Sequence, residues 1–195
     1  FIDALNAVSD PRRAAYFEEV TAGGYVGGVY GLQSPYNANS HVGDAMHQPD
    51  FPGNLFDAAE YHFILAEASA RGFNVGGTAA GHYTAGITAS MEEWLGAGVD
   101  ASSYLAQAGV AFDASTAAAQ IGTEKWIAMY SNASEAYNTV RQYDLTMNVA
   151  DLAQTVTPNR YSYPLDEISL NLDNVNAAKA KFGNDDTFAK VFWDM

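Results

Sequence analysis

The chain contains no cysteine and few basic residues. Its 195 residues include 9 Lys plus Arg against 23 Asp plus Glu. The absence of cysteine excludes disulfides, thiolate metal sites and cysteine nucleophiles from this sequence. A formal net charge of -14 repels phosphate backbones and anionic lipid headgroups, which argues against nucleic-acid binding and electrostatic membrane docking. The expected partner is a neutral or cationic ligand, or another protein.

Long hydrophobic runs are also absent from the chain. No apolar run approaches the roughly 20 residues that a membrane-spanning helix needs. The sequence opens at Phe1 without an initiator Met or a signal peptide, and residues 1–5 have the pattern of the middle of an amphipathic segment. We therefore expect further residues before Phe1, with any export or lipidation signal among them. A content of 48% hydrophobic and 16% charged residues predicts a folded chain.

Apolar residues recur at steps of three and four along most of the chain, which predicts an all-α fold. Small residues such as Ala66, Gly86 and Ala89 lie where paired helices would touch, as in tetratricopeptide-type stacking. An irregular helical bundle is the alternative that this pattern leaves open. The predicted helices span residues 1–8, 55–71, 79–94, 100–108, 115–130, 134–143 and 173–182.

The longest segment without helical periodicity covers residues 21–54, and it is rich in Gly, Asn, Ser and Pro. A loop of this length is usually functional or mobile. It contains Tyr25, Tyr30, Tyr36 and Asn37. Aromatic faces bind the apolar faces of sugar rings, and nearby amide groups fix sugar hydroxyls. These four residues are the candidate ligand-binding site; the alternative is that the tyrosines anchor the loop to the helical body.

The sequence contains no convincing catalytic or metal-binding motif. Glu60 and Glu67 project from one predicted helix, whereas glycoside hydrolysis needs two carboxylates that face each other across a cleft. His41 and His47 flank Asp44 in the long loop, without the tight spacing of a zinc site. Nucleophile elbows and phosphate-binding loops are absent. We therefore predict a protein that is not an enzyme and that has no cofactor and no metal site.

Six segments follow one another in the order found in a known family. They are Asp10-Pro11-Arg12, Phe56–Gly72, His82–Met91, Ile121–Tyr130, Asn159–Pro164 with the following Glu167, Asn171 and Asn174, and the terminal Phe192-Trp193-Asp194. Together they resemble the SusD/RagB family, the surface nutrient-binding lipoproteins of Bacteroidota. Where that family usually has Trp followed by an Arg-Arg pair, this chain has Tyr137 and then Arg141-Gln142.

The resemblance implies a SusD-like helical scaffold in which tetratricopeptide-type helix pairs carry long, ligand-facing loops. Residues 1–195 would form the C-terminal part of a single SusD-like domain whose N-terminal part precedes this sequence. The implied function is non-enzymatic capture of oligosaccharides for import through a SusC-like TonB-dependent transporter. A peptide-binding family member and a structural subunit of an outer-membrane assembly are the alternatives. The implied location is the outer membrane at the cell surface, with a lipid anchor ahead of Phe1.

Overall fold

The computed structural model describes residues 1–29, 32–145, 158–183 and 187–191. The chain divides into two compact units, residues 1–145 and 146–195. Regular structure in the described ranges is helical, and their one extended pairing is an isolated antiparallel bridge between Phe17 and Val42. The prediction of an all-α fold is therefore confirmed. Within the same ranges, every helix is too short or too polar to cross a bilayer.

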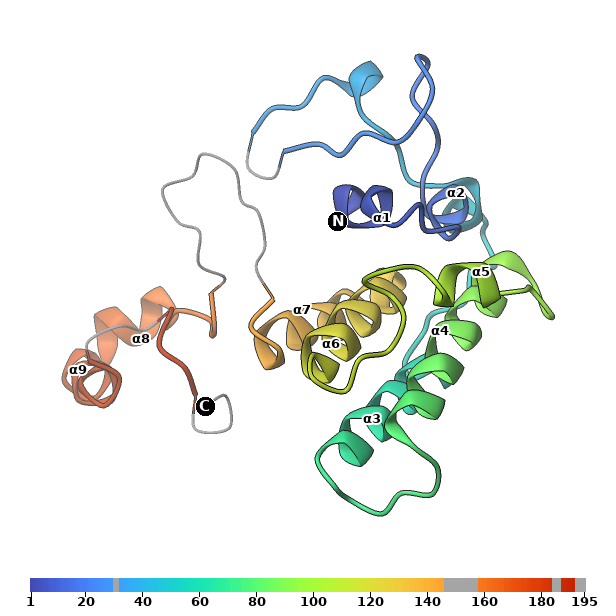
Figure 1. The fold of residues 1–195 in the computed structure, drawn as a ribbon. Coiled ribbons are helices and arrows are strands. Elements are labelled where there is room, and N and C mark those ends of the chain that lie inside the picture. The colour runs from blue at the N-terminus through green and yellow to red at the C-terminus, as the bar shows by residue number, and fades with distance from the viewer. Residues whose placement is uncertain (30–31, 146–157, 184–186, 192–195) are drawn as a thin grey trace. The chain divides into compact units, whose positions relative to one another are not determined.

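The predicted helices of the first unit occur in the predicted order, with different bounds, and the short helix α2 was not predicted (Figure 1). The helices of this unit are α1 (Ile2–Ala7), α2 (Arg13–Tyr16), α3 (Ala58–Ala70), α4 (Ala79–Leu95), α5 (Ser102–Leu105), α6 (Ala117–Ala128) and α7 (Ala133–Gln142), with the 3-10 turns η1 (Tyr36–Ala38), η2 (Asp44–His47) and η3 (Met129–Ser131).

Helices α3 and α4 form a hairpin that supplies much of the core. The side chain of Asp57 caps α3 by accepting from the Glu60 amide at 2.6 Å, so the helix begins at Ala58. The prediction of a helical start at Leu55 was wrong, because capping by Asp57 leaves Leu55 outside the helix and 92% exposed. Gly86 of α4 faces the Phe63 ring of α3, where an added Cβ would lie 3.0 Å from ring atoms.

Helix α6 packs on both α3 and α7, which places it at the centre of the unit (Figure 1). A glycine at position 122 allows the close contact with the end of α7, because an added Cβ would lie 2.5 Å from Cγ of Tyr143. The buried members of this core include Phe63, Ile87, Met91, Ile121 and Met129.

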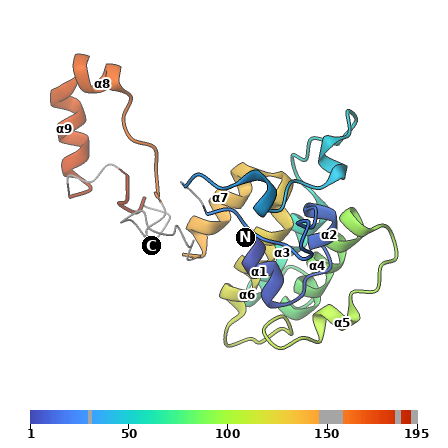
Figure 2. The same ribbon diagram turned by 90° about the horizontal axis from the view of Figure 1, so that it is seen from above.

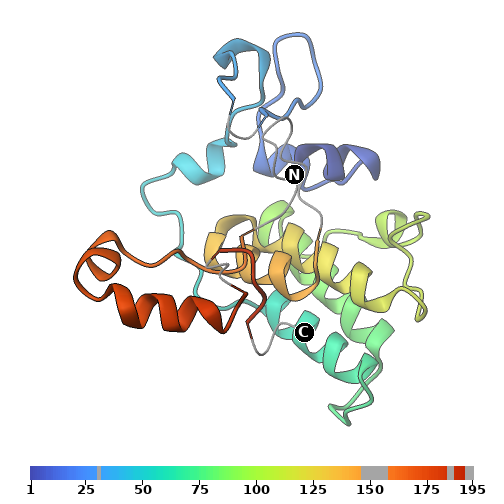
Figure 3. The same cartoon turned by 90° about the vertical axis from the view of Figure 1, so that its left-hand side faces the viewer.

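A second, aromatic cluster joins α1 and α2 to the helices beneath them. The Tyr16 ring is fully buried and stacks on Tyr130 at 4.3 Å between ring centres, and Trp94 meets it edge-on at 4.6 Å. The Tyr16 hydroxyl donates to the carbonyl oxygen of Ile127 at 3.1 Å. Figure 2 shows α1 and α2 lying over the bundle, and Figures 1 and 3 show residues 21–29 and 32–42 projecting from the same side.

The described part of the second unit contains α8 (Leu165–Leu170) and α9 (Leu172–Ala180). Helix α8 was not predicted from the sequence, whereas α9 matches the helix predicted at 173–182 within two residues at each end. The segment before α8 is held by Asn159, whose Nδ2 donates to the carbonyl oxygen of Phe188 at 2.6 Å. The Arg160 guanidinium lies 4.5 Å from the Phe182 ring centre. The terminal motif at residues 192–194 lies outside the described residues.

Candidate functional site

A buried ionic network lies where α2 meets the bundle. Both the Arg12 and Asp10 side chains are fully buried, and Nη2 of Arg12 donates to Oδ2 of Asp10 at 2.6 Å. The same nitrogen donates to Oε2 of Glu124 in α6 at 2.8 Å. Nη1 donates to Oγ of Ser90 in α4 at 3.1 Å. Tyr104 in α5 donates through its hydroxyl to Oε1 of Glu124 at 2.7 Å. The network around the Arg12 guanidinium therefore connects the start of α2 to α4, α5 and α6.

Electrostatics keep the Arg12 guanidinium charged and the Tyr104 hydroxyl neutral. Burial alone lowers the pKa of the Arg12 guanidinium, but the carboxylates of Glu124 and Asp10 raise that pKa well above its ordinary value. Burial raises the pKa of the Tyr104 hydroxyl, and the Glu124 carboxylate raises it further, so Tyr104 remains a neutral donor. All partners lie inside the protein, which identifies the network as a structural support below the long loop.

The long loop leaves the body and returns to it beside α2. The Glu18 amide donates to the carbonyl oxygen of His41 at 2.9 Å, and the Gly43 amide donates to that of Tyr16 at 2.8 Å. Between these two bonds lies the bridge of Phe17 with Val42. Glycine is required at position 43, because a Cβ there would collide with the carbonyl oxygen of Ala15. These contacts join residues 16–18 to residues 41–43 and form the base of the loop. The base closes the segment that carries the predicted site residues.

Among the described aromatic side chains of this segment, Tyr36 is the most exposed, at 74%. Its ring stacks on the imidazole of His41, with ring centres 3.7 Å apart and planes at 27°. Nε2 of His41 donates to the carbonyl oxygen of Tyr36 at 2.8 Å. On its other side, Nδ1 of His41 lies 3.6 Å from Oε2 of Glu18. One face of the Tyr36 ring is therefore covered by His41, while most of the side chain remains accessible.

The other predicted site residues have different surroundings. Tyr25 is half-buried, and the Arg13 guanidinium lies 5.2 Å from its ring centre. Its carbonyl oxygen accepts from Nδ2 of Asn6 at 2.9 Å, which ties this end of the loop to α1. Asn37 is exposed beside Tyr36 in η1. Tyr30 lies outside the described residues.

The two glutamates of α3 have structural partners. Oε1 of Glu60 lies 3.5 Å from Nζ of Lys125, and both side chains are buried. Glu67 accepts from the hydroxyl of Tyr143 at 2.7 Å and pairs with Arg71 at 2.6 Å. Within the described residues, these contacts do not pair either carboxylate with a second one, as glycoside hydrolysis would require.

Two histidines, His62 and His82, lie at the hairpin of α3 and α4. Nδ1 of His62 in α3 lies 3.4 Å from Nδ1 of His82 in α4. Nε2 of His82 donates to the carbonyl oxygen of Gly76 at 2.6 Å, closing the connection between the helices. His47 is exposed in η2. In the described ranges, no group of three or more His, Cys, Asp or Glu side chains is arranged to hold a metal ion.

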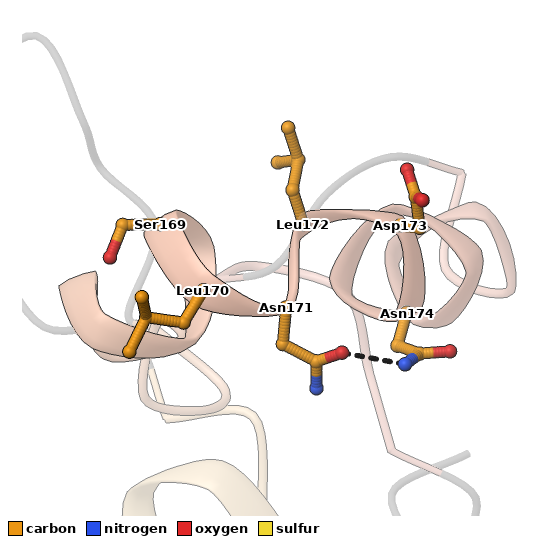
Figure 4. A pocket seen from close by; sticks show the side chains of 6 residues that line it. All are labelled: Ser169, Leu170, Asn171, Leu172, Asp173 and Asn174. Atoms are coloured by element: carbon orange, nitrogen blue, oxygen red, sulfur yellow. Dashed lines mark hydrogen bonds between the residues drawn. The ribbon is translucent and has the colours of Figure 1, made fainter.

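A shallow hollow of about 320 Å³ lies in the second unit, at the junction of α8 and α9 (Figure 4). It is lined by six consecutive residues, 169–174, and Figure 4 shows the Asn174 amide donating to Oδ1 of Asn171. No aromatic side chain lines it, and the lining comes from one stretch of chain. It therefore lacks the convergent groups that a ligand site needs.

Comparison with known proteins identifies the family. Residues 1–164 match the model of a family described as "Starch-binding associating with outer membrane", of the SusD-like type. The chain belongs to the SusD-like family. The resemblance based on six ordered motifs is thereby confirmed. No curated protein matches this SusD-like chain in sequence.

Solved structures agree with this family. A SusD-like protein from Bacteroides thetaiotaomicron is 26% identical, with a TM-score of 0.79, and the match covers 100% of this chain and 49% of that one. A chitin-binding protein is also 26% identical, with a TM-score of 0.72 and coverage of 100% and 48%. A Bacteroidetes SusD-like protein is 28% identical over 85% of this chain and 35% of that one, with a TM-score of 0.67. The SusD-like chain thus spans about half the length of these structures or less.

Proposed function

We propose that this chain captures oligosaccharides at the cell surface, without converting them, for import through a SusC-like TonB-dependent transporter. The family description of starch binding and outer-membrane association supports this proposal. So does the chitin-binding protein that is 26% identical to the chain. The observation that carries the proposal is Tyr36, an exposed ring backed by His41 in a polar loop with a closed base.

The proposed binding site consists of Tyr36 and Asn37, together with Tyr25 and Tyr30 of the same loop. The accessible face of Tyr36 suits the apolar C–H face of a pyranose ring, and the exposed amide beside it suits sugar hydroxyls. Tyr25 marks the rigid end of the site, because Asn6 and Arg13 hold it against the first two helices. The acidic surface favours neutral sugars over anionic ones.

The absence of catalysis is part of the proposal. Glu60 and Glu67 are engaged by Lys125, Tyr143 and Arg71, so neither provides a free acid or base. The buried carboxylates of Asp10 and Glu124 are both bound to Arg12. Within the described residues, these arrangements support binding rather than hydrolysis.

The family also suggests how this chain fits into a longer protein. Residues 1–195 would form the C-terminal part of a longer SusD-like domain, anchored by lipid to the outer membrane. The chain alone then holds the closed loop and its supporting bundle, and the longer protein would complete the ligand site and the transporter contact. Co-purification with a large outer-membrane β-barrel protein would support this arrangement.

Calorimetry on the full-length protein that contains this chain tests the proposed site, with malto-oligosaccharides and chito-oligosaccharides as probes. Tyr36→Ala should weaken binding by about 1 kcal/mol, roughly fivefold, which is the lower end of the range of about 1–3 kcal/mol for a nucleobase stacked on an aromatic side chain. The melting temperature should hardly change, since most of the Tyr36 side chain is exposed. Tyr61→Ala, an exposed tyrosine of α3, is the matched control and should leave affinity unchanged.

The opposite pattern would show that Tyr36 is structural: a lower melting temperature for Tyr36→Ala at unchanged affinity. Binding of peptides in place of both glycan series would support a peptide-binding member of the family. Silence toward glycans and peptides, with stable attachment to an outer-membrane complex, would support a structural subunit.

A further inference from the structure

Among the described residues, His41 is the one that restrains the Tyr36 side chain. Tyr36 lies in η1, a three-residue turn in the loop, and is 74% exposed. A side chain this exposed ordinarily samples several rotamers, and ordering it on binding opposes affinity. A ring that is already held in one orientation avoids most of that loss.

His41 contacts Tyr36 at two places. Its imidazole lies 3.7 Å from the phenol ring, centre to centre, and its Nε2 donates to the carbonyl oxygen of the same tyrosine at 2.8 Å. The hydrogen bond fixes the backbone of η1, and the stacking fixes the ring direction. The two contacts act together, because both depend on one imidazole orientation.

The backbone of His41 is itself held from the body side. The Glu18 carboxylate lies 3.6 Å from Nδ1 of His41, and the Glu18 amide donates to the His41 carbonyl oxygen at 2.9 Å. Glu18 follows α2 and Phe17, whose ring lies 5.1 Å from that of Tyr130, in the aromatic cluster. A continuous set of contacts thus runs from the buried cluster through Glu18 and His41 to Tyr36.

We propose that His41 is a positioning residue, which holds the Tyr36 ring in a ligand-ready orientation through stacking and through its bond to the Tyr36 carbonyl. This inference rests on the proposed function, because it takes Tyr36 as the residue that contacts sugar. It adds that Glu18 and His41 prepare the ring before ligand arrives. His41 supports affinity without touching the sugar.

The test uses the full-length protein that contains this chain, and two independent readouts. In the absence of ligand, NMR of ring-labelled tyrosine reports whether the Tyr36 ring protons feel the ring current of a stacked imidazole. Calorimetry with chito-oligosaccharides and malto-oligosaccharides reports affinity. His41→Ala should abolish the Tyr36 ring-current shift and weaken binding about two- to tenfold, the loss expected when one side chain must be ordered on binding.

Two further variants separate positioning from general structure. His41→Phe keeps an aromatic surface under Tyr36 and should restore most of the affinity lost in His41→Ala. His47→Ala removes an exposed histidine of η2 and should leave both the ring shift and affinity unchanged. Melting temperatures of all variants identify any loss that reflects unfolding of the loop base.

An unchanged Tyr36 ring shift in His41→Ala overturns the inference, whatever the ligand result. A lost ring shift with unchanged affinity also overturns it, because the ring orientation would not matter for binding. If wild-type protein binds neither glycan series, the proposed function fails for these ligands, and the NMR readout still decides whether His41 holds Tyr36. A lost shift together with weaker binding, rescued by His41→Phe, supports the inference.

Discussion

Arg12 and Glu124 form an ion pair across 112 positions of sequence, with Nη2 and Oε2 2.8 Å apart inside the protein. The pair connects the turn at the start of α2 to the central helix α6. The base of the candidate loop follows α2 directly, so the orientation of that base depends on this buried contact. A mutation at Arg12 or Glu124 can therefore disturb the loop by weakening the contacts that orient its base, although both residues lie outside the proposed ligand site.

Removing the Arg12 charge should strongly destabilise the fold. Arg12→Met leaves the carboxylates of Asp10 and Glu124 buried without their cation, which typically costs about 3–5 kcal/mol in the free energy of unfolding. Urea unfolding measures this loss. Arg71→Gln is the control: Arg71 is 65% exposed, and its pair with Glu67 should contribute less than about 1 kcal/mol. Equal losses for the two variants would contradict a central role for Arg12.

Gly122→Ala should destabilise the contact of α6 with α7. A Cβ at this position would lie 2.5 Å from Cγ of Tyr143, and overpacking of this kind costs about 1–3 kcal/mol. The loss should exceed the gain of up to about 1 kcal/mol that alanine brings to a helix interior. Gly81→Ala, in the exposed first turn of α4, should instead be neutral or stabilising. Thermal unfolding of both variants checks the contrast, and a stabilised Gly122→Ala would refute it.

Glu93 should make stability depend on pH in the mildly acidic range. Glu93 is partly exposed, but the partial desolvation of its carboxyl raises its pKa above the ordinary value of 4.5, and the nearby Asp57 carboxylate raises it further. The folded protein then holds this proton more tightly than the unfolded chain. Its stabilising contribution is present below pH 4.5 and is lost as pH rises through the raised pKa.

Glu93→Gln cannot ionise, so the variant does not lose this contribution to stability as pH rises. The free energy of unfolding of the variant, relative to wild type, should therefore rise as pH increases from below 4.5 through the raised pKa of Glu93. Denaturant unfolding at a series of pH values measures the difference. A difference that stays constant across this range would show that Glu93 does not titrate differently in the two states.

The net charge of -14 should discriminate between sugars. Neutral chito-oligosaccharides should bind more tightly than oligogalacturonates of the same length, because the Glu18 carboxylate lies beside the Tyr36–His41 pair. The gap should narrow as salt is raised, since the screening length falls from about 10 Å at 0.1 M to about 3 Å at 1 M. Calorimetry at two ionic strengths measures this. Tighter binding of the acidic sugar at low salt would contradict the prediction.

Local pattern predicted the helices better than it predicted their ends. The bounds of α4 were predicted within one residue, because its apolar periodicity and the stop at Gly96 are both local signals. The start of α3 was missed because Leu55 and Phe56 continue the apolar pattern, while Asp57 caps the helix after them. Helix α8 has six residues, too few to show a period.

The candidate site was only partly visible in the sequence. Tyr36 stood out as an aromatic residue in a polar loop, but the sequence did not indicate that its ring stacks on His41 or that His41 contacts Glu18, which lies 23 positions earlier than the histidine. Arg12 was noted only as part of a family motif, since arginine is usually exposed. Its burial depends on Ser90, Tyr104 and Glu124, which lie 78, 92 and 112 positions away. Pairings over such separations leave no local periodicity.

The closure between Glu18 and His41 has a consequence for how this surface can change. The hydrogen bonds from Glu18 and Gly43 at the base join backbone atoms, so they tolerate almost any side chain in the segment that they enclose. Substitutions and length changes between residues 19 and 40 can therefore accumulate without altering the bundle, provided that Gly43 is kept. Related chains can acquire new ligand preferences by exchanging this segment, and in the laboratory the same two junctions are suitable points for grafting a loop from one relative onto another.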